Sequence, residues 1–116
     1  MTSFEAGDII VVDYPHVETN QLKRRPALVV SAKPIGPDAM VLWAVMITSA
    51  ANKRWPGDVV ITDHKALGLP IPSVVRTEKI TTLECSGADL ICKCDNALLA
   101  EVRAQVAGYL GLGAVA

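Results

Sequence analysis

The sequence predicts a mainly β fold, a small barrel of about five strands followed by one C-terminal amphipathic helix. Short runs of β-branched and other apolar residues are separated by clusters of proline, glycine and aspartate, which is typical of strands and turns. Near the C-terminus the apolar residues recur every three or four positions, as on one face of a helix. We expect a barrel because closure removes the exposed edges of a small sheet.

The first two predicted strands flank a polar segment. The run Ile9–Val12 follows a glycine and an aspartate and ends before Pro15, as a buried strand bounded by turn residues does. A second apolar run, Ala27–Val30, begins after Pro26, whose ring favours an extended backbone at the preceding residue. Residues 16–25 show no regular pattern and are predicted to form an exposed loop, longer than most strand connections.

Three further strands and a helical turn are predicted in the middle of the chain. The third strand spans Met40–Ile47 and should pair with the second as a hairpin, because a cluster of turn residues separates them. A short fourth strand is predicted at Val59–Ile61, and Asp63–Leu67 is predicted to form a single helical turn. Threonines and apolar residues then favour an extended backbone at Ser73–Leu83, the fifth predicted strand.

The last predicted element is the amphipathic helix, for which Asp95 is the expected N-cap residue. Its apolar residues at helical spacing are Leu98, Leu99, Val102, Val106, Tyr109 and Leu110. The chain contains no internal repeat and no linker-like stretch between these elements. Residues 1–116 are therefore interpreted as a single domain.

The composition restricts the class of protein. Hydrophobic residues make up 51% of the chain and charged residues 20%, which argues against intrinsic disorder and provides enough material for a packed core. With 11 basic and 12 acidic residues, the formal net charge is only −1, so the molecule as a whole does not attract a polyanion. Any nucleic-acid site must be a local patch of basic residues.

The usual cofactor and metal motifs are not found in the sequence. It has no phosphate-binding glycine loop, no serine nucleophile elbow and no dinucleotide fingerprint. Cys85, Cys92 and Cys94 are an odd number of cysteines with no histidine nearby, and their spacing does not suit a zinc site. We therefore expect reduced thiols, no metal and no cofactor.

The expected location is the cytoplasm, with no attachment to a membrane. The N-terminal residues include acids where a secretory signal would have basic residues followed by an apolar run. The longest apolar stretch, Met40–Ile47, is too short to cross a bilayer.

Basic residues cluster in two of the predicted loops. The first loop carries Lys23, Arg24 and Arg25, and the loop at residues 50–58 carries Lys53, Arg54 and Trp55. If both loops open on the same side of the barrel, the cations could hold phosphates while the tryptophan stacks on a base, as unpaired RNA requires. The alternative is that these residues are ordinary solvated surface cations.

The two histidines, His16 and His64, lie in different predicted loops. They could serve as an acid–base pair only if the fold brought them together. Otherwise each is a partly exposed loop residue.

Several segments together resemble the MazF/PemK family of toxins from type II toxin–antitoxin systems. The residues from Gly7 to Pro15, then Gln21, then Arg25 to Ser31 match the family in both order and spacing. Ile47-Thr48 matches the end of the family's third strand, and Ser73-Val74 matches the start of its fifth. The resemblance covers about Gly7 to Glu84 and extends more loosely over the terminal helix.

This resemblance implies a Src-homology-three-like barrel of the MazF/CcdB type, a homodimer and a cognate antitoxin as partner protein. It also implies an enzyme, a sequence-specific and metal-independent endoribonuclease, or mRNA interferase, that cleaves single-stranded RNA. The ribose 2′-hydroxyl attacks the adjacent phosphate and leaves a 2′,3′-cyclic phosphate and a 5′-hydroxyl. Because the nucleophile belongs to the RNA, the enzyme need only align the attack, move protons and stabilise charge.

The resemblance also assigns roles to individual residues. Arg25 is implied to be the principal catalytic residue, and its planar fork suits a paired contact with the scissile phosphate. Thr48 is implied to donate a hydroxyl hydrogen bond to the same phosphate. The residues expected to bind RNA are Gln21, Lys23, Arg24, Lys53, Arg54 and Trp55. The alternatives are that Arg25 is a surface cation and that the Thr48 hydroxyl satisfies backbone at a strand end.

Two other functions remain open at this stage. A gyrase-poisoning toxin of the CcdB type shares the barrel but acts through its C-terminal helix, whereas here that helix lacks a tryptophan near its end and the cations lie in loops. A catalytically inactive binding module is favoured by departures in the fifth strand, where Lys79 and Thr81 replace the glutamine and arginine often found in the family. RNA cleavage is the preferred interpretation.

Overall fold

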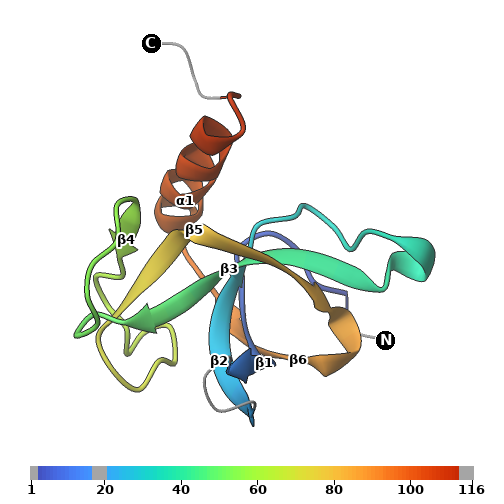
Figure 1. The fold of residues 1–116 in the computed structure, drawn as a ribbon, viewed down its shortest axis with the longest axis horizontal. Coiled ribbons are helices and arrows are strands. Elements are labelled where there is room, and N and C mark those ends of the chain that lie inside the picture. The colour runs from blue at the N-terminus through green and yellow to red at the C-terminus, as the bar shows by residue number, and fades with distance from the viewer. Residues whose placement is uncertain (1–2, 17–20, 113–116) are drawn as a thin grey trace.

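The computed structural model describes residues 3–16 and 21–112, and for residues 14–16 and 21–23 it describes the backbone alone. One six-stranded sheet and one α-helix form the architecture (Figure 1). The elements are β1 (Asp8–His16), β2 (Gln21–Val29), β3 (Val41–Ser49), β4 (Asp58–Val60), β5 (Ser73–Glu84), β6 (Ala88–Lys93) and α1 (Asn96–Tyr109). The predicted mainly β fold with a C-terminal helix is confirmed.

The sheet is antiparallel, curved and open. Its strand order is β4-β5-β3-β2-β1-β6, so β2 and β3 pair as the predicted hairpin. The predicted closure into a barrel is wrong, because β4 and β6 form the two edges and no pairing joins them among the residues described. The pairing of β5 with β3 is interrupted by a register shift between Val45 and Met46, a bulge of the kind that bends a strand. The sheet therefore curls without forming a complete ring.

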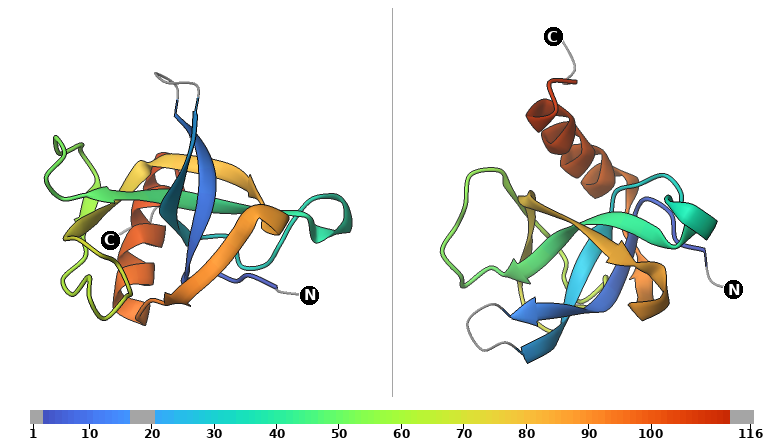
Figure 2. Two further views of the ribbon diagram at one scale, coloured as in Figure 1. Left: turned by 90° about the horizontal axis from the view of Figure 1, so that it is seen from below. Right: turned by 45° about the vertical axis from the view of Figure 1, so that its right-hand side comes forward.

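The segment predicted as a loop at residues 16–25 is largely strand. β1 continues to His16 and β2 begins at Gln21, with backbone partners running from His16↔Gln21 to Val12↔Arg25. The two strands project from the rest of the sheet as a ribbon (Figure 2, left). Strand pairing is a backbone interaction, so a polar composition did not reveal it. Of the predicted loop, residues 17–20 lie outside the described part of the chain.

The sixth strand was not predicted from the sequence. β6 pairs with β1 at one edge of the sheet, and Leu90 and Ile91 on it are exposed. An edge strand with exposed apolar residues lacks the alternation that identifies a half-buried strand. At Asp63–Leu67, where a single helical turn is predicted, the structure has consecutive turns closed by hydrogen bonds between residues three to five apart.

Two clusters of buried side chains form the core, one on each face of the central strands. On β2, Leu28 belongs to the first cluster and Ala27 and Val29 belong to the second, as strand alternation requires. α1 covers the first cluster through Val102, which is fully buried. The N-cap prediction is confirmed, because Asp95 Oδ1 accepts a 2.7 Å hydrogen bond from the backbone N–H of Leu98.

The helix and the projecting end of the β1–β2 ribbon lie at opposite ends of the molecule (Figures 1 and 2). α1, at 14 residues, is not long and apolar enough to cross a membrane, and the same holds for the other helical segments described.

Candidate active site

Arg25 and Thr48 line one cavity of about 310 Å³ where β2 meets the end of β3. The remaining lining residues come from neighbouring strand ends and loops, namely Arg24, Pro26, Ile47, Ser49, Asn52, Leu69, Pro70, Ile71 and Ser73. The fold thus brings the two predicted catalytic residues together, although they are far apart in the sequence.

The strand register explains why these two residues share the cavity. The pairing of β2 with β3 ends at Ala27↔Met46, and Arg25 and Thr48 each lie two residues beyond this last pair on their own strands. Both residues therefore lie beyond the same end of the paired region, where they line the cavity. Arg25 is half-buried and lies within a paired strand, not in the exposed loop that the sequence predicted.

The Thr48 hydroxyl has a side-chain partner that sequence reasoning missed. Asn52 Nδ2 donates a 2.7 Å hydrogen bond to Thr48 Oγ1. Because the amide is the donor, the hydroxyl keeps its own hydrogen for a second acceptor. The alternative in which this hydroxyl satisfies backbone is not what the structure shows. An amide side chain four residues after the threonine, just beyond a strand end, was the available signal.

Arg24 lines the same cavity, but its guanidinium is engaged by acids. Nη2 lies 2.5 Å from Asp89 Oδ2, and Nη1 lies 3.4 Å from Asp13 Oδ1. Both pairs are exposed to solvent, so each contributes little to stability. The two carboxylates nevertheless offset the positive charge that Arg24 was predicted to offer RNA.

The loop at residues 50–57 is held by a buried ion pair. Arg76 Nε and Nη2 donate to the two carboxylate oxygens of Asp58 at 3.2 and 3.0 Å, and Nη2 also donates to the Lys53 carbonyl at 2.8 Å. Burial raises the pKa of the Asp58 carboxyl. Hydrogen bonds from Arg76 and from the Trp55 backbone, together with the positive charges of Arg76 and Arg54, outweigh burial and leave this pKa below its usual range. A charged, structurally constrained pair therefore anchors this loop.

Lys53, Arg54 and Trp55 lie on this loop and are not among the residues that line the Arg25–Thr48 cavity. The Arg76 guanidinium stacks over the Trp55 ring, 4.5 Å from its centre, which covers part of the surface predicted to stack on a base. These three residues thus lie outside the cavity lining, and the expectation that both basic loops open on one side of the molecule stays a prediction. The contribution of these three residues to RNA binding stays a prediction.

Four further candidates are the two histidines, Gln21 and Lys23. The side chains of His16, Gln21 and Lys23 lie outside the described residues, and their backbones belong to the end of the β1–β2 ribbon. His64 is half-buried in a turn, where its carbonyl accepts from the N–H groups of Leu67 and Leu69. His64 is also absent from the lining of the Arg25–Thr48 cavity.

The three cysteines are free thiols. Burial raises the pKa of each of them, so the neutral thiol is favoured. Within residues 3–16 and 21–112, no group of three or more potential metal ligands lies close enough to hold a metal ion.

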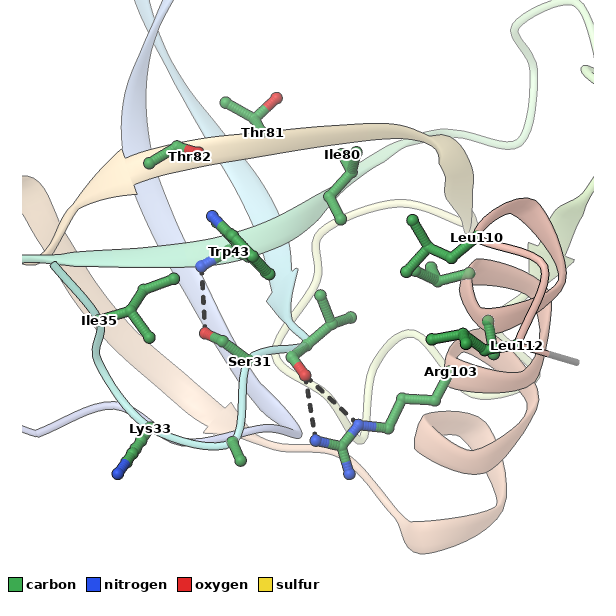
Figure 3. Close-up of a pocket in the computed structure, with 14 residues that line it drawn as sticks. Ser31, Lys33, Ile35, Trp43, Ile80, Thr81, Thr82, Arg103, Leu110 and Leu112 are labelled. Carbon is green, nitrogen blue, oxygen red and sulfur yellow. Dashed lines mark hydrogen bonds between the residues drawn. The ribbon is translucent and has the colours of Figure 1, made fainter.

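A second, larger depression of about 780 Å³ lies between α1 and the strands β3 and β5 (Figure 3). Trp43, Ile80 and Leu110 line it and are substantially exposed. The Arg103 guanidinium donates two hydrogen bonds to the backbone carbonyl of Val30, at 3.1 and 3.3 Å. These donors of the cation are therefore used within the protein. The depression suits apolar contact, whereas the Arg25–Thr48 cavity has the groups that suit a phosphate.

Solved structures with this fold include proteins from Deinococcus radiodurans and from a mycobacterial species. MazF of Deinococcus radiodurans is 29% identical, with a TM-score of 0.76 over 96% of this chain and 99% of that chain. A MazE-MazF structure from the same organism is 26% identical, with a TM-score of 0.75 over 97% of this chain and 100% of that one. An endoribonuclease from a mycobacterial species is 20% identical and shares the fold, with a TM-score of 0.71 over 99% and 98% of the two chains.

A comparison with curated proteins found no match. A family profile described as a PemK-like, MazF-like toxin of type II toxin-antitoxin systems matches residues 5–110, from before β1 to the end of α1. The match includes both residues of the proposed catalytic pair and the loop that carries Asn52. This chain therefore belongs to the PemK-like, MazF-like family of toxins of type II toxin–antitoxin systems.

Proposed function

We propose that this toxin is a metal-independent endoribonuclease that cuts single-stranded RNA at short sequence motifs. The observation that carries the proposal is the cavity shared by Arg25 and Thr48. A half-buried guanidinium and a hydroxyl with a hydrogen to donate are suitable partners for the oxygens of one phosphate.

The proposed reaction needs no nucleophile from the protein. The ribose 2′-oxygen forms a bond to the adjacent phosphorus and loses its proton, while the bond from phosphorus to the 5′-oxygen breaks and that oxygen gains a proton. The products are a 2′,3′-cyclic phosphate and a 5′-hydroxyl. Negative charge grows on the phosphoryl oxygens as the five-coordinate state forms, and groups already directed at those oxygens lower its free energy.

Arg25 and Thr48 divide this task in the proposed mechanism. The Arg25 guanidinium holds two phosphoryl oxygens and stabilises their charge, and it is a poor general base because it stays protonated. Thr48 donates its hydroxyl hydrogen to the same phosphate. The remaining predicted RNA-binding residues would fix the strand on either side, which aligns the 2′-oxygen with the leaving oxygen.

We also propose that the toxin acts as a homodimer in the cytoplasm and is restrained by a cognate antitoxin. The antitoxin proposal is supported by family membership and by the relative from Deinococcus radiodurans, which was solved as MazE-MazF. The homodimer rests on the family resemblance, and the cytoplasmic site of action is the expectation drawn from the sequence.

The test is incubation of purified protein with mixed-sequence single-stranded RNA in EDTA, followed by mapping of the fragment ends. Arg25→Ala is the test variant, and Lys33→Ala is the control because it removes an exposed cation that does not line the Arg25–Thr48 cavity. We expect discrete cuts ending in cyclic phosphate, greatly reduced in Arg25→Ala and largely retained in Lys33→Ala. Arg25→Ala protein that cuts at the wild-type rate would overturn the mechanism. Growth arrest without RNA fragments would instead favour gyrase poisoning or an inactive binding module.

A further inference from the structure

We propose that Asn52 is a positioning residue that orients the Thr48 hydroxyl toward the substrate phosphate. This inference rests on the proposed endoribonuclease function and adds a residue that neither the sequence analysis nor the family resemblance identified. It starts from one contact, the 2.7 Å hydrogen bond from Asn52 Nδ2 to Thr48 Oγ1.

The direction of this hydrogen bond determines its effect. A hydroxyl can donate one hydrogen and accept through its lone pairs, whereas the amide nitrogen of asparagine can only donate. When Asn52 donates, Thr48 is the acceptor, and its own hydrogen is available to a phosphoryl oxygen in the cavity that both residues line. The contact thus selects the orientation that the proposed mechanism requires.

The turn after β3 holds Asn52 in place from its N-terminal side. The backbone N–H of Asn52 donates to the Ser49 carbonyl at 3.1 Å, and that of Ala51 donates to Ser49 Oγ at 3.1 Å. These bonds close the turn just beyond the end of β3. Asn52 is therefore fixed relative to the strand that carries Thr48.

The buried ion pair holds the same residue from its C-terminal side. Arg76 Nη2 donates to the carbonyl of Lys53, the residue after Asn52, while the same guanidinium binds Asp58. Asn52 is thus tied to β3 through Ser49 and to β5 through Arg76. Groups held in place before the reaction need no reorganisation as charge develops, which is why such positioning affects the rate.

Asn52 is exposed, so its replacement should leave the fold largely intact. The test compares wild type, Asn52→Ala, Asn52→Asp, Thr48→Ala and the double variant in single-turnover RNA cleavage, with kcat and KM measured separately for the active forms. Ala51→Ser is the matched control, because it changes an exposed neighbour on the same turn and keeps the backbone donor. Thermal unfolding of every variant checks the fold.

We expect Asn52→Ala to lower kcat about five- to tenfold with little change in KM, since one orienting hydrogen bond is lost. Asn52→Asp should be slower still, because a carboxylate accepts the Thr48 hydrogen and turns it away from the phosphate. In the Thr48→Ala background, loss of Asn52 should have no further effect, as for two residues that act as one unit. Ala51→Ser should cut at the wild-type rate.

Two results would overturn this assignment while leaving the proposed function in place. Equal losses from Asn52→Ala with and without Thr48 would mean that Asn52 acts independently of the hydroxyl. An Asn52→Asp protein at the wild-type rate would mean that the amide oxygen, not the nitrogen, faces Thr48. Wild-type protein that cuts no RNA would overturn the proposed function, and the role of Asn52 would fall with it.

Discussion

Arg76 of β5 donates two hydrogen bonds to the carboxylate of Asp58 at the start of β4, from Nε to Oδ1 at 3.2 Å and from Nη2 to Oδ2 at 3.0 Å. The side chains are 10% and 1% exposed, so both charges have lost most of their hydration. Such a pair is not a large net source of stability, but removing one member leaves an uncompensated buried charge. Loss of one member of this buried pair should therefore lower the free energy of unfolding more than loss of one member of an exposed ion pair.

Removal of Arg76 should destabilise the protein strongly. Arg76→Met leaves Asp58 charged and buried and releases the Lys53 carbonyl, so we expect a loss of about 3–5 kcal/mol in the free energy of unfolding. Urea denaturation followed by circular dichroism measures this loss. Arg24→Met removes an exposed arginine with two carboxylate partners and should cost less than about 1 kcal/mol. Equal losses from the two variants would contradict the assigned role of burial.

The ion pair should make stability depend on pH in the acid range. The pKa of the Asp58 carboxyl is lowered in the folded protein from its ordinary value of 3.8, so the unfolded chain binds this proton more readily than the folded one. The stabilisation is fully present above the ordinary value and is lost as the pH falls through the lower folded value. The urea midpoint of unfolding, measured from pH 7 down to pH 2.5, should fall at the acid end. In Asp58→Asn the midpoint should fall less steeply over the same acid range. The same fall of the midpoint in wild type and in Asp58→Asn would show that other groups control acid unfolding.

Loss of the helix cap should have a moderate and local effect. Asp95→Ala removes the acceptor for the Leu98 N–H and should lower the free energy of unfolding by about 1 kcal/mol. Glu101→Ala is the matched control, since it removes an exposed carboxylate from the same helix without touching the cap. The two variants can be compared by thermal unfolding at neutral pH. A larger loss for Glu101→Ala would rule out capping as the explanation.

Gly57 is expected to tolerate no side chain. Its φ is 82°, and a Cβ there would collide with the Tyr109 hydroxyl, which hydrogen-bonds to Thr77 Oγ1 at 2.8 Å. Gly57→Ala should cost at least about 1 kcal/mol through backbone strain and loss of this contact. Gly87→Ala, where a Cβ meets nothing within 4 Å, should stay within about 0.5 kcal/mol of wild type in the same urea titration. Similar results for both glycines would contradict the predicted collision.

The elements that the sequence predicted well are those defined by local patterns. The helix and its cap at Asp95 follow from side-chain spacing and from the preference of aspartate for N-cap positions, and neither depends on the rest of the fold. β6 and the ends of β1 and β2 were missed because backbone pairing at a sheet edge requires no particular side chains. The bend of the sheet likewise depends on a register shift between β3 and β5 that no local pattern revealed.

The site was predictable in part for the same reason. Arg25 and Thr48 were identified from motifs, and the register of β2 with β3 accounts for their meeting. Asn52 became visible only when the turn after β3 was known, because its role depends on that turn's geometry. Arg76 was missed as well, since its partner Asp58 lies 18 residues away and its burial follows from the packing of the loop.

Arg25 lies within a strand that is paired to β1, at a position opposite Val12. Its backbone is thus part of the framework of the molecule, while the turn and loop at residues 50–57 are attached outside that framework. Variation in loop length or composition can accumulate over evolution without displacing this arginine. The same separation offers a practical route for engineering, in which loop libraries that keep Asn52 are screened for new RNA preferences while Arg25 stays in place.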